Sequence, residues 1–295
     1  MSELKIGIIG IAGAWSTEVL ADRVAAKTGF RSIINLAEVR WDLTSGDVFH
    51  GDDNLKSYHA LIVKKIAPSY SPDCLNRLHL LDWLQHHGVQ VYSNPNDMGR
   101  LLNRLSCTTI LNAAGIPMPP TQITESIEQA VATINNYEEV VLKPLFSTKA
   151  KGMTVIHKND DNIVEQLENF QRDFGLFYIQ KKIPIPGRDL GLMFLGGEYI
   201  GTYARVAASD AWNTTTRDGG KYAPHTPRDT TIAIATKAQA QFNLAFTTVD
   251  VVETDQDEDT IVFEVSAFGG FRGAKEALNM DIANLYSDLV INNIK

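Results

Sequence analysis

Cysteine and long apolar runs are both scarce in this sequence. Its 295 residues include two cysteines, Cys74 and Cys107, which lie far apart and so exclude a disulfide framework or a cysteine-rich zinc site. The longest apolar runs, such as residues 6–14, are much shorter than the roughly 20 residues that cross a membrane. The first residues lack a basic segment and a small-residue cleavage site. We therefore expect a cytoplasmic protein without a membrane partner.

The sequence also lacks an excess of positive charge. It has 27 lysines and arginines against 35 aspartates and glutamates, a formal net charge of −8, which argues against a broad surface for nucleic acid or anionic lipid. We therefore expect no nucleic-acid partner. Basic residues nevertheless form local clusters, which are typical either of bound phosphate or of solvated surface lysines. These clusters are Lys64–Lys65, Lys149/Lys151 and Lys181–Lys182.

Strands and helices alternate in the first third of the chain. Apolar runs of strand length occupy residues 6–11, 32–36, 60–66 and 89–92. Residues 71–87 carry leucines at helical spacing and end at Gly88, a favourable residue after a helix. This alternation predicts a small, mainly parallel sheet in residues 1–97, bounded by the turn-rich residues 93–97.

The remaining residues, 98–295, read differently. A helix predicted over residues 97–114 is stopped by the glycine and prolines of residues 115–120. Residues 120–182 then predict a compact α+β unit, with helices over 126–137 and 161–170 and strands over 140–145, 153–156 and 177–180. Residues 183–295 are rich in strands, predicted over 190–195, 199–206, 247–253 and 260–266, with helices over 231–242 and 282–292.

Two acidic residues occupy a predicted hairpin near the C-terminus. If pairing is centred on Asp257, Asp250 lies opposite Glu264, with side chains about 4.5–5.5 Å apart, where like charges destabilise a sheet. A cation between them removes the repulsion, and Mg²⁺ prefers such oxygen ligands. Ser266 lies on the face of Glu264 and offers a third oxygen. The alternative is a different register with solvated acids.

A lysine and a polar loop form the second informative feature. Lys143 stands within an apolar strand, where a charge is costly unless it is paired. The loop that follows, up to Gly152, is short and basic and suits a phosphate chain. The alternative is a lysine that extends to the surface. Gly7, Gly10 and Gly13 lack the spacing of a dinucleotide fingerprint, so we interpret them as a tight turn that borders the substrate.

These features, taken in order, resemble the ATP-grasp superfamily and, within it, the RimK-type amino-acid ligases. The resemblance rests on residues 103–117, 143–152, 179–183, 187–189 and 217–220, together with Arg205, Asp250 and 264–266. Residues 63–66, 142–150, 211–217 and 264–273 are most similar to the ATP-grasp branch of the GAK system. The resemblance implies an α/β protein with an ATP-grasp fold, in which two α+β lobes sandwich ATP. Residues 1–97 precede that fold as a parallel-sheet domain, and residues 98–295 form it, with a lid lobe at about 120–182 and a C-terminal lobe at about 183–295.

The resemblance also implies site residues. For ATP they are Arg104, Lys143, Ser147, Thr148, Lys149, Gly152, Gln180, Lys181, Ile183 and Asp189; for metal, Asp250, Glu264 and Ser266; for catalysis, Lys143, Arg205 and Arg217; for substrate, Arg188, Asn213 and Lys221. Several positions depart from the family pattern. Gly191 replaces an arginine, Lys181 an acid, Ser147 and Ala150 two loop glycines, and Ser266 an asparagine that ligates metal.

The implied activity is an ATP-dependent carboxylate–amine ligase that works through an acyl phosphate, with Mg²⁺ in one or two sites that Mn²⁺ can also fill. Glutamate or a related amino acid would be joined to a small molecule, cofactor precursor or peptide. A homo-oligomer, dimer or tetramer, is expected. Two alternatives stay open: a nucleotide-binding regulatory protein that has lost catalysis, and a small-molecule kinase on the same fold. For Arg188, Arg205 and Arg217 the alternative is a surface ion pair.

Overall fold

The N-terminal residues form a four-stranded parallel sheet. This computed structural model describes residues 4–148, 150–207, 219–254 and 259–294. The sheet has the order β2-β1-β6-β7, all parallel, which confirms the prediction. Its strands are β1 (Ile6–Ile9), β2 (Ile33–Ile34), β6 (Ala60–Val63) and β7 (Gln90–Tyr92). The helices α1 (Trp15–Thr28) and α2 (Cys74–His86) pack against it, and Gly88 follows α2 with a φ of +94°.

A small antiparallel sheet inserted in this unit was not predicted. It consists of β3 (Val39–Asp42), β4 (Asp47–His50) and β5 (Asp53–Asn54), flanked by the short 3₁₀ turns η1 (Leu36–Glu38) and η2 (Leu55–Ser57). These strands are short, half-exposed and polar, so they lack the apolar runs from which strands are predicted in a sequence.

The helix predicted over residues 97–114 is in fact two helices. α3 (Pro95–Leu102) ends at Asn103, and α4 (Arg104–Ala113) begins directly after it. Asn103 has an extended backbone, and its side-chain oxygen accepts hydrogen bonds from the backbone N–H groups of Leu105 and Ser106. An N-cap asparagine therefore starts a second helix and turns the chain, which places Arg104 at the first position of α4.

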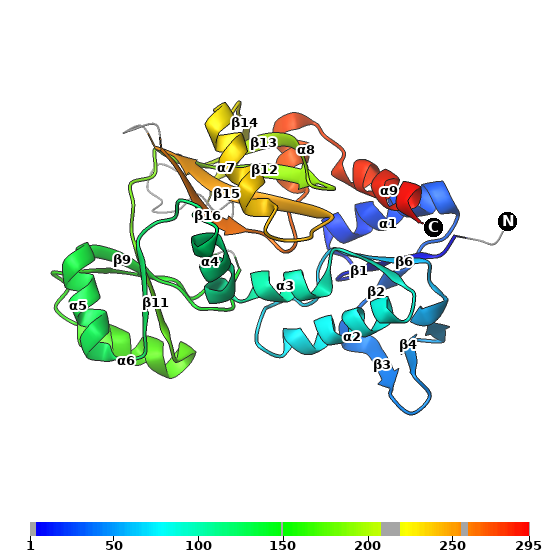
Figure 1. Cartoon of the computed structure of the whole chain (residues 1–295), viewed down its shortest axis with the longest axis horizontal. Helices are drawn as coiled ribbons and strands as arrows, with labels where there is room; N and C mark the ends of the chain where they lie inside the picture. The colour runs from blue at the N-terminus through cyan, green and yellow to red at the C-terminus, as the bar shows by residue number, and fades with distance from the viewer. Residues whose placement is uncertain (1–3, 149, 208–218, 255–258, 295) are drawn as a thin grey trace.

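The lid lobe is a four-stranded antiparallel sheet covered by two helices. The strand order is β10-β9-β11-β8, and the bounds are β8 (Thr121–Thr124), β9 (Glu139–Leu142), β10 (Thr154–His157), β11 (Phe177–Lys181), α5 (Ile127–Tyr137) and α6 (Ile163–Phe174). These elements share a separate hydrophobic core that includes Ile134, Leu142 and Phe177. In Figure 1 the lobe projects from one end of the molecule.

The C-terminal lobe is built on a five-stranded antiparallel sheet. The strand order is β14-β13-β12-β15-β16, with bounds β12 (Arg188–Leu195), β13 (Glu198–Val206), β14 (Lys221–Pro224), β15 (Phe246–Glu253) and β16 (Thr260–Val265). Three helices complete it: α7 (Asp229–Gln239), α8 (Arg272–Leu278) and α9 (Ile282–Asn293). β8, β14 and α8 were absent from the sequence prediction, because each is short and only partly apolar.

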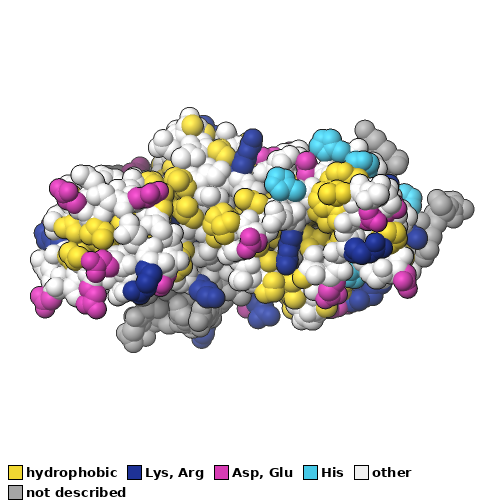
Figure 2. All heavy atoms as spheres, turned by 90° about the horizontal axis from the view of Figure 1, so that it is seen from below, with side chains coloured by type: hydrophobic (Ala, Val, Ile, Leu, Met, Phe, Trp, Pro, Cys, Tyr) yellow, Lys and Arg dark blue, Asp and Glu magenta, His cyan; other side chains and the backbone are white. Residues whose placement is uncertain are grey.

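The last helix returns to the first. α9 packs against α1 beside the N-terminal sheet (Figure 1), and the ion pairs Arg23–Asp281 and Lys27–Asp288 join the two helices. Residues of the N-terminal sheet and of the C-terminal lobe, such as Ile8 and Tyr286, pack together in one buried core. Acidic and basic side chains are mixed over the face shown in Figure 2, and histidines gather toward the end that carries the N-terminal sheet. In the portion of the chain described, no helix has the length and apolarity to cross a bilayer.

Candidate active site

A cavity of about 440 Å³ lies between the lid-lobe sheet and the C-terminal sheet. Strands from both lobes and the start of α4 contribute to its wall. Its lining residues are Arg104, Glu139, Val141, Lys143, Ala150, Met153, Gln180, Lys181, Lys182, Ile183, Pro184, Ile185, Gly187, Asp189, Ala207, Asp250, Phe263 and Glu264. Eight residues proposed from the sequence for ATP or metal are among them, so the fold gathers segments that are far apart in the chain.

Asp250 and Glu264 face each other across β15 and β16, as predicted from the hairpin. The register shifts by one residue directly beyond this pair, because Phe263 bulges out of β16. Asp250 is half-buried, and its buried Oδ1 has no hydrogen-bond partner among the residues that the structure describes. Burial raises the pKa of Asp250 to about 7, and the nearby Asp189 and Glu264 carboxylates add to that effect while Arg205 opposes it.

Arg205 neutralises two carboxylates at once. Its guanidinium donates to Asp189, with Nε 3.0 Å from Oδ1, and its Nη2 lies 2.8 Å from Oδ2 of Asp250. Burial works against the guanidinium's charge, but the attraction of Asp250 and Asp189 outweighs it and raises the Arg205 pKa well above its usual value. The register places Asp189 opposite Arg205 and Asp250 opposite Gly191, so all three charged groups share one face of the sheet.

Arg104 connects the second acid to the loop of the lid lobe. Its Nη1 lies 3.3 Å from Oε2 of Glu264, while its Nε donates to the carbonyl of Pro144 at 3.2 Å and its Nη2 to Ser147 Oγ at 3.4 Å. The backbone N–H of Arg104 also donates to the carbonyl of Leu145. One arginine at the start of α4 thus contacts both strand β16 and the loop after Lys143.

Lys143 is a buried cation without a carboxylate in hydrogen-bond contact among the described residues. Its Nζ donates to Gln180 Oε1 and lies 5.5 Å from the centre of the Phe263 ring. Burial and, to a smaller extent, the positive charge of Arg104 lower the pKa of Lys143 to about 7, against a partial offset by Glu264. An ammonium group in this position is stabilised by an anion that enters the cavity.

The loop that follows Lys143 depends on one glycine. Gly152 has a φ of +75°, and a Cβ there would lie 2.9 Å from Cζ of Phe174 and 3.0 Å from Cγ of Pro144. Ala150 also has a positive φ, +57°, at which a non-glycine residue is strained. Ser147 and Thr148 are half-buried in this loop, and Lys149 lies outside the described residues. The loop therefore has a defined course across the cavity at the residues described.

The connection between the lobes borders the same cavity. Gln180 is buried and donates through Nε2 to Thr121 Oγ1 at 3.1 Å, which orients its oxygen toward Lys143. Lys181 and Ile183, two of the residues that the family resemblance implies for ATP, also line the cavity. The sequence reading missed Glu139, which pairs with Lys182 at 2.8 Å. Glu139 and Val141 stand four and two residues before Lys143, so strand alternation would have placed all three on one face.

Other candidate residues lie elsewhere. Ser266 donates its backbone N–H to the carbonyl of Thr248, follows the end of β16 and is not one of the lining residues. Arg188 and Lys221 both pair with Val206 in the sheet, so they share the face opposite to that of Arg205. Asn213 and Arg217 lie outside the described residues.

A glycine explains one departure from the family pattern. A Cβ on Gly191 would lie 2.5 Å from Cζ of Tyr203, whose ring is buried. The Tyr203 ring therefore occupies the space that an arginine side chain at position 191 requires. Arg205 is the arginine that this sheet face retains beside Asp189 and Asp250.

The residues fit a hard divalent cation. The two opposed carboxylates, Asp250 and Glu264, offer oxygen donors of the type that Mg²⁺ uses, and Oδ1 of Asp250 is buried without a partner among the described residues. In the described part of the chain, no group of three or more acidic, histidine or cysteine side chains is placed to hold a metal. If a magnesium ion binds to these carboxylates, phosphate oxygens and water would complete its coordination, as is usual for Mg²⁺ in nucleotide sites.

Comparison with known proteins agrees with this geometry. Residues 102–290 match the model of the RimK-like ATP-grasp domain. The tetrahydromethanopterin:alpha-L-glutamate ligase of Methanosarcina acetivorans is 27% identical over 266 residues, which cover 84% of this chain and 82% of that protein. The ligase of the same name from Methanocaldococcus jannaschii is 25% identical over 228 residues, covering 76% of this chain and 77% of that protein.

Solved structures share the fold over the whole chain. The ATP-grasp ligase PsnB, complexed with a phosphomimetic variant of its minimal precursor, Mg and ADP, superimposes with a TM-score of 0.76 at 15% identity and covers 99% of both chains. The RimK domain protein ATP-grasp from Sphaerobacter thermophilus has a TM-score of 0.74 at 19% identity, covering 96% of this chain and 98% of that one. The predicted fold class is confirmed. The chain therefore belongs to the RimK-like ATP-grasp family and is an ATP-dependent carbon–nitrogen ligase.

Proposed function

We propose that this ligase activates a substrate carboxylate with ATP and joins it to the amine of glutamate or a related amino acid. The carboxylate would belong to a small molecule, a cofactor precursor or a peptide. The observation that carries the proposal is the pairing of Asp250 with Glu264 beside three cations, the buried Lys143 and the half-buried Arg104 and Arg205. Two of the similar proteins are glutamate ligases by name, which supports glutamate as the amine.

ATP is proposed to occupy the cavity with its base at residues 180–183 and its phosphates toward Lys143. The apolar lining residues, such as Val141, Met153 and Ile183, suit a flat base, and the backbone of residues 180–183 offers donors and acceptors for it. Ser147, Thr148, Lys149 and Gly152 would cover the phosphates. The phosphates would supply the anion that the buried Lys143 ammonium needs.

Asp250 and Glu264 are the residues proposed to hold Mg²⁺, in one or two sites that Mn²⁺ can also occupy, with Ser266 as an additional oxygen. Bound there, the metal would neutralise charge on the phosphate oxygens. Arg205 and Arg104 lie against these carboxylates and would contribute positive charge from the protein side.

The proposed reaction has two steps. An oxygen of the substrate carboxylate forms a bond to the γ-phosphorus of ATP while the bond to the β–γ bridging oxygen breaks, which gives an acyl phosphate and ADP. The amine nitrogen then attacks the carbonyl carbon, phosphate leaves with the C–O bonding electrons, and the nitrogen loses a proton. Lys143, Arg104 and Arg205 would stabilise charge in the first step. Arg217, Asn213, Arg188 and Lys221 are the substrate residues proposed from the sequence.

The proposal is tested by incubating the protein with Mg-ATP, L-glutamate and candidate carboxylates drawn from an extract of the native cell. We expect ADP and free phosphate in equal amounts, together with a condensed product in the mass spectrum. ADP with a phosphorylated product would indicate a kinase instead. Nucleotide binding without ADP release under any condition would indicate a protein that has lost catalysis.

We further propose that residues 1–97, the lid lobe at about 120–182 and the C-terminal lobe at about 183–295 are the domains of this chain. We also propose that the protein is a homo-oligomer, a dimer or a tetramer. The separate hydrophobic core of the lid lobe supports its independence. Light scattering of the purified protein would give the oligomeric state, and a monomer at micromolar concentration would contradict the second half of this proposal.

A further inference from the structure

A lysine of the N-terminal domain contacts the loop that follows β16. This loop, residues 266–271, begins two residues after Glu264 and leads directly into α8. Lys64 comes directly after β6, and its Nζ donates a hydrogen bond to the carbonyl of Gly269 at 2.7 Å. A side chain from the first 97 residues thus reaches the segment next to the Asp250–Glu264 pair.

The backbone of Lys64 is held by the N-terminal sheet. Its N–H donates to the carbonyl of Ile9 at 2.9 Å, and the N–H of Lys65 donates to the same carbonyl at 3.1 Å. Ile9 is the last residue of β1, which pairs with β6 along its buried length. The hydrogen bond to Gly269 therefore starts from a backbone position that is attached to the sheet.

The ammonium group of Lys64 is buried at a cost in free energy. Lys64 is 7% exposed, and its Nζ lies 4.6 Å from the centre of the Phe271 ring. Burial and, to a smaller extent, the charge of Lys65 lower the pKa of Lys64 to about 7. A methionine would fill a similar space without this desolvation cost. The contribution that needs a lysine is therefore its hydrogen bond to Gly269.

The beginning of the loop is attached to β15 instead. The N–H of Ser266 donates to the carbonyl of Thr248 at 2.8 Å, and the Thr247 hydroxyl donates to the carbonyl of Ser266 at 2.7 Å. Three residues further on, the carbonyl of Gly269 accepts from Lys64. The middle of the loop thus depends on a contact with the N-terminal domain, whereas its beginning depends on the C-terminal sheet.

A second residue of the N-terminal domain contacts the same loop. Tyr70 lies between β6 and α2, and its ring centre is 5.8 Å from that of Phe268. Burial raises the pKa of Tyr70, and nearby negative charge, including that of Glu264, adds to the rise. Lys64 and Tyr70 therefore contact two successive residues of the loop, Gly269 and Phe268.

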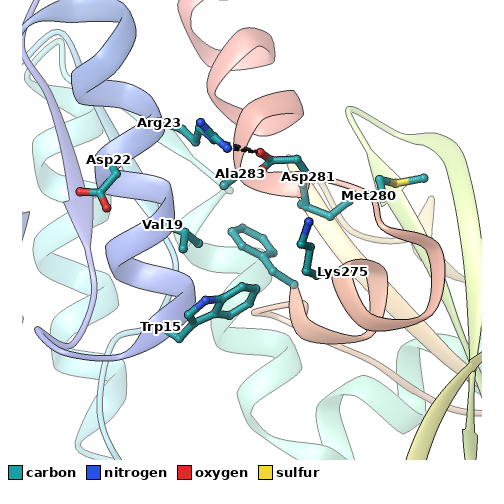
Figure 3. Close-up of a pocket in the computed structure, with 10 residues that line it drawn as sticks. Trp15, Val19, Asp22, Arg23, Lys275, Met280, Asp281 and Ala283 are labelled. Carbon is teal, nitrogen blue, oxygen red and sulfur yellow. Dashed lines mark hydrogen bonds and ion pairs between the residues drawn. The ribbon is translucent and has the colours of Figure 1, made fainter.

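Open space borders the far end of the loop. The Phe271 ring packs on Phe246, with 5.3 Å between the ring centres. Phe271 also lines a cavity of about 380 Å³ between α1 and the segment that joins α8 to α9 (Figure 3). A cavity leaves room for side chains to shift. The contact of the Lys64 ammonium with the Phe271 ring opposes such a shift where the loop enters α8.

We propose that Lys64 is a positioning residue of the ligase reaction: its hydrogen bond to Gly269 fixes the loop 266–271 beside the carboxylate pair of Asp250 and Glu264. This inference rests on the proposed function, because it concerns the geometry of the same centre. Lys64 is not among the residues that line the cavity proposed for ATP, so it acts through the loop and not on the nucleotide.

Lys64→Met tests the proposal, because it keeps the length of the side chain and removes the hydrogen-bond donor. Its melting temperature should equal or exceed that of the unmodified protein, since a buried charge is lost. In the assay with L-glutamate and the cell extract, kcat for ADP release should nevertheless fall about tenfold or more, because a displacement of about 1 Å can cost about a hundredfold in rate. The KM for ATP should not change.

Hydrogen exchange of the protein saturated with Mg-ADP reports on the loop without any substrate. The amides of residues 267–271 should exchange about tenfold faster in Lys64→Met, since a hydrogen bond to a charged group is lost. Tyr70→Leu should accelerate exchange of the same amides through the second contact. The exposed Lys237 is the matched control, and Lys237→Met should exchange and turn over as the unmodified protein does.

An unchanged kcat in Lys64→Met would overturn the proposal, and so would unchanged exchange of residues 267–271. A lower melting temperature with an unchanged kcat would show that Lys64 serves stability alone. The unmodified protein decides on the proposed function: if it forms no condensed product, the proposed function and this inference fail together. If it forms the product and Lys64→Met forms it at the same rate, this inference fails alone.

Discussion

The carboxylates of Asp250 and Glu264 face each other on neighbouring strands, yet each is held by a different arginine. Arg205 contacts Asp250 at 2.8 Å, and Arg104 contacts Glu264 at 3.3 Å. The two arginines compensate part of the repulsion between the acids, and Oδ1 of Asp250 is left without a partner in the described structure. The two arginines thus compensate the carboxylates without a cation, and the unpartnered oxygen supports the proposal that the pair binds one.

Removing the Asp250 charge should change how stability depends on pH. Because the folded-state pKa, about 7, is above the unfolded value near 3.8, the folded protein binds more protons between these limits. Its free energy of unfolding should thus fall as pH rises through this window. In Asp250→Asn that decline should be smaller. Urea unfolding of metal-free protein at several pH values measures it, and equal slopes in both proteins would contradict the pKa assignment.

Binding of nucleotide should be coupled to protonation of Lys143. Phosphate oxygens near the ammonium would raise its pKa from about 7, so Mg-ADP binding at about pH 8 should take up a proton. Lys143→Met should bind Mg-ADP more weakly and lose most of this uptake. Calorimetry in buffers with different ionisation enthalpies measures the number of protons, and Lys237→Met is the control. Equal uptake in Lys143→Met would show that another group is responsible.

Gly152→Ala should destabilise the loop that we propose to cover the phosphates of ATP. The added Cβ would have to adopt a positive φ and would lie 2.9 Å from Phe174, so we expect a destabilisation of about 1–3 kcal/mol. The loss should appear as a lower melting temperature and a weaker affinity for Mg-ADP. Gly175→Ala, also at a positive φ but with open space beside it, separates the backbone strain from the contact with Phe174. A Gly152→Ala variant as stable as Gly175→Ala would argue against the contact.

Gly191 should not tolerate the arginine of the family pattern. Even Gly191→Ala places a Cβ 2.5 Å from Tyr203, and overpacking of this kind costs about 1–3 kcal/mol. The arginine variant should be less stable still. Thermal unfolding of Gly191→Ala, alone and combined with Tyr203→Leu, measures the coupling between the two positions. If the cost of Gly191→Ala is the same with and without the Tyr203 ring, the steric explanation is wrong.

Much of the fold could be predicted from apolar periodicity. The strands near residues 60–66 and 177–180 are fully buried apolar runs, and they were found at nearly the right bounds. Apolar periodicity did not predict β3, β4 and β14, because these strands are short and partly polar. Tertiary contacts, and not their own sequence pattern, stabilise them. The break at Asn103 was overlooked because its capping role was not distinguished from that of a polar residue inside a helix.

The site was predictable only where sequence order and strand alternation determine geometry. The pairing of Asp250 with Glu264 followed from the hairpin, although the bulge at Phe263 did not. The contact of Arg205 with Asp189 and Asp250 depends on a sheet that joins three separate strands, which periodicity alone does not reveal. The same holds for Lys64 and Gly269, which are 205 residues apart.

The most direct test of the account is ADP release from Mg-ATP by Asp250→Asn, measured with L-glutamate and an extract of carboxylate substrates. The unmodified protein should release ADP and form a condensed product. Asp250→Asn should still fold, as shown by a cooperative thermal transition, but release ADP at least about a hundredfold more slowly, because the carboxylate pair proposed to hold Mg²⁺ is lost. Turnover at an undiminished rate in this variant would contradict the assignment of Asp250 and Glu264 as the centre of the reaction.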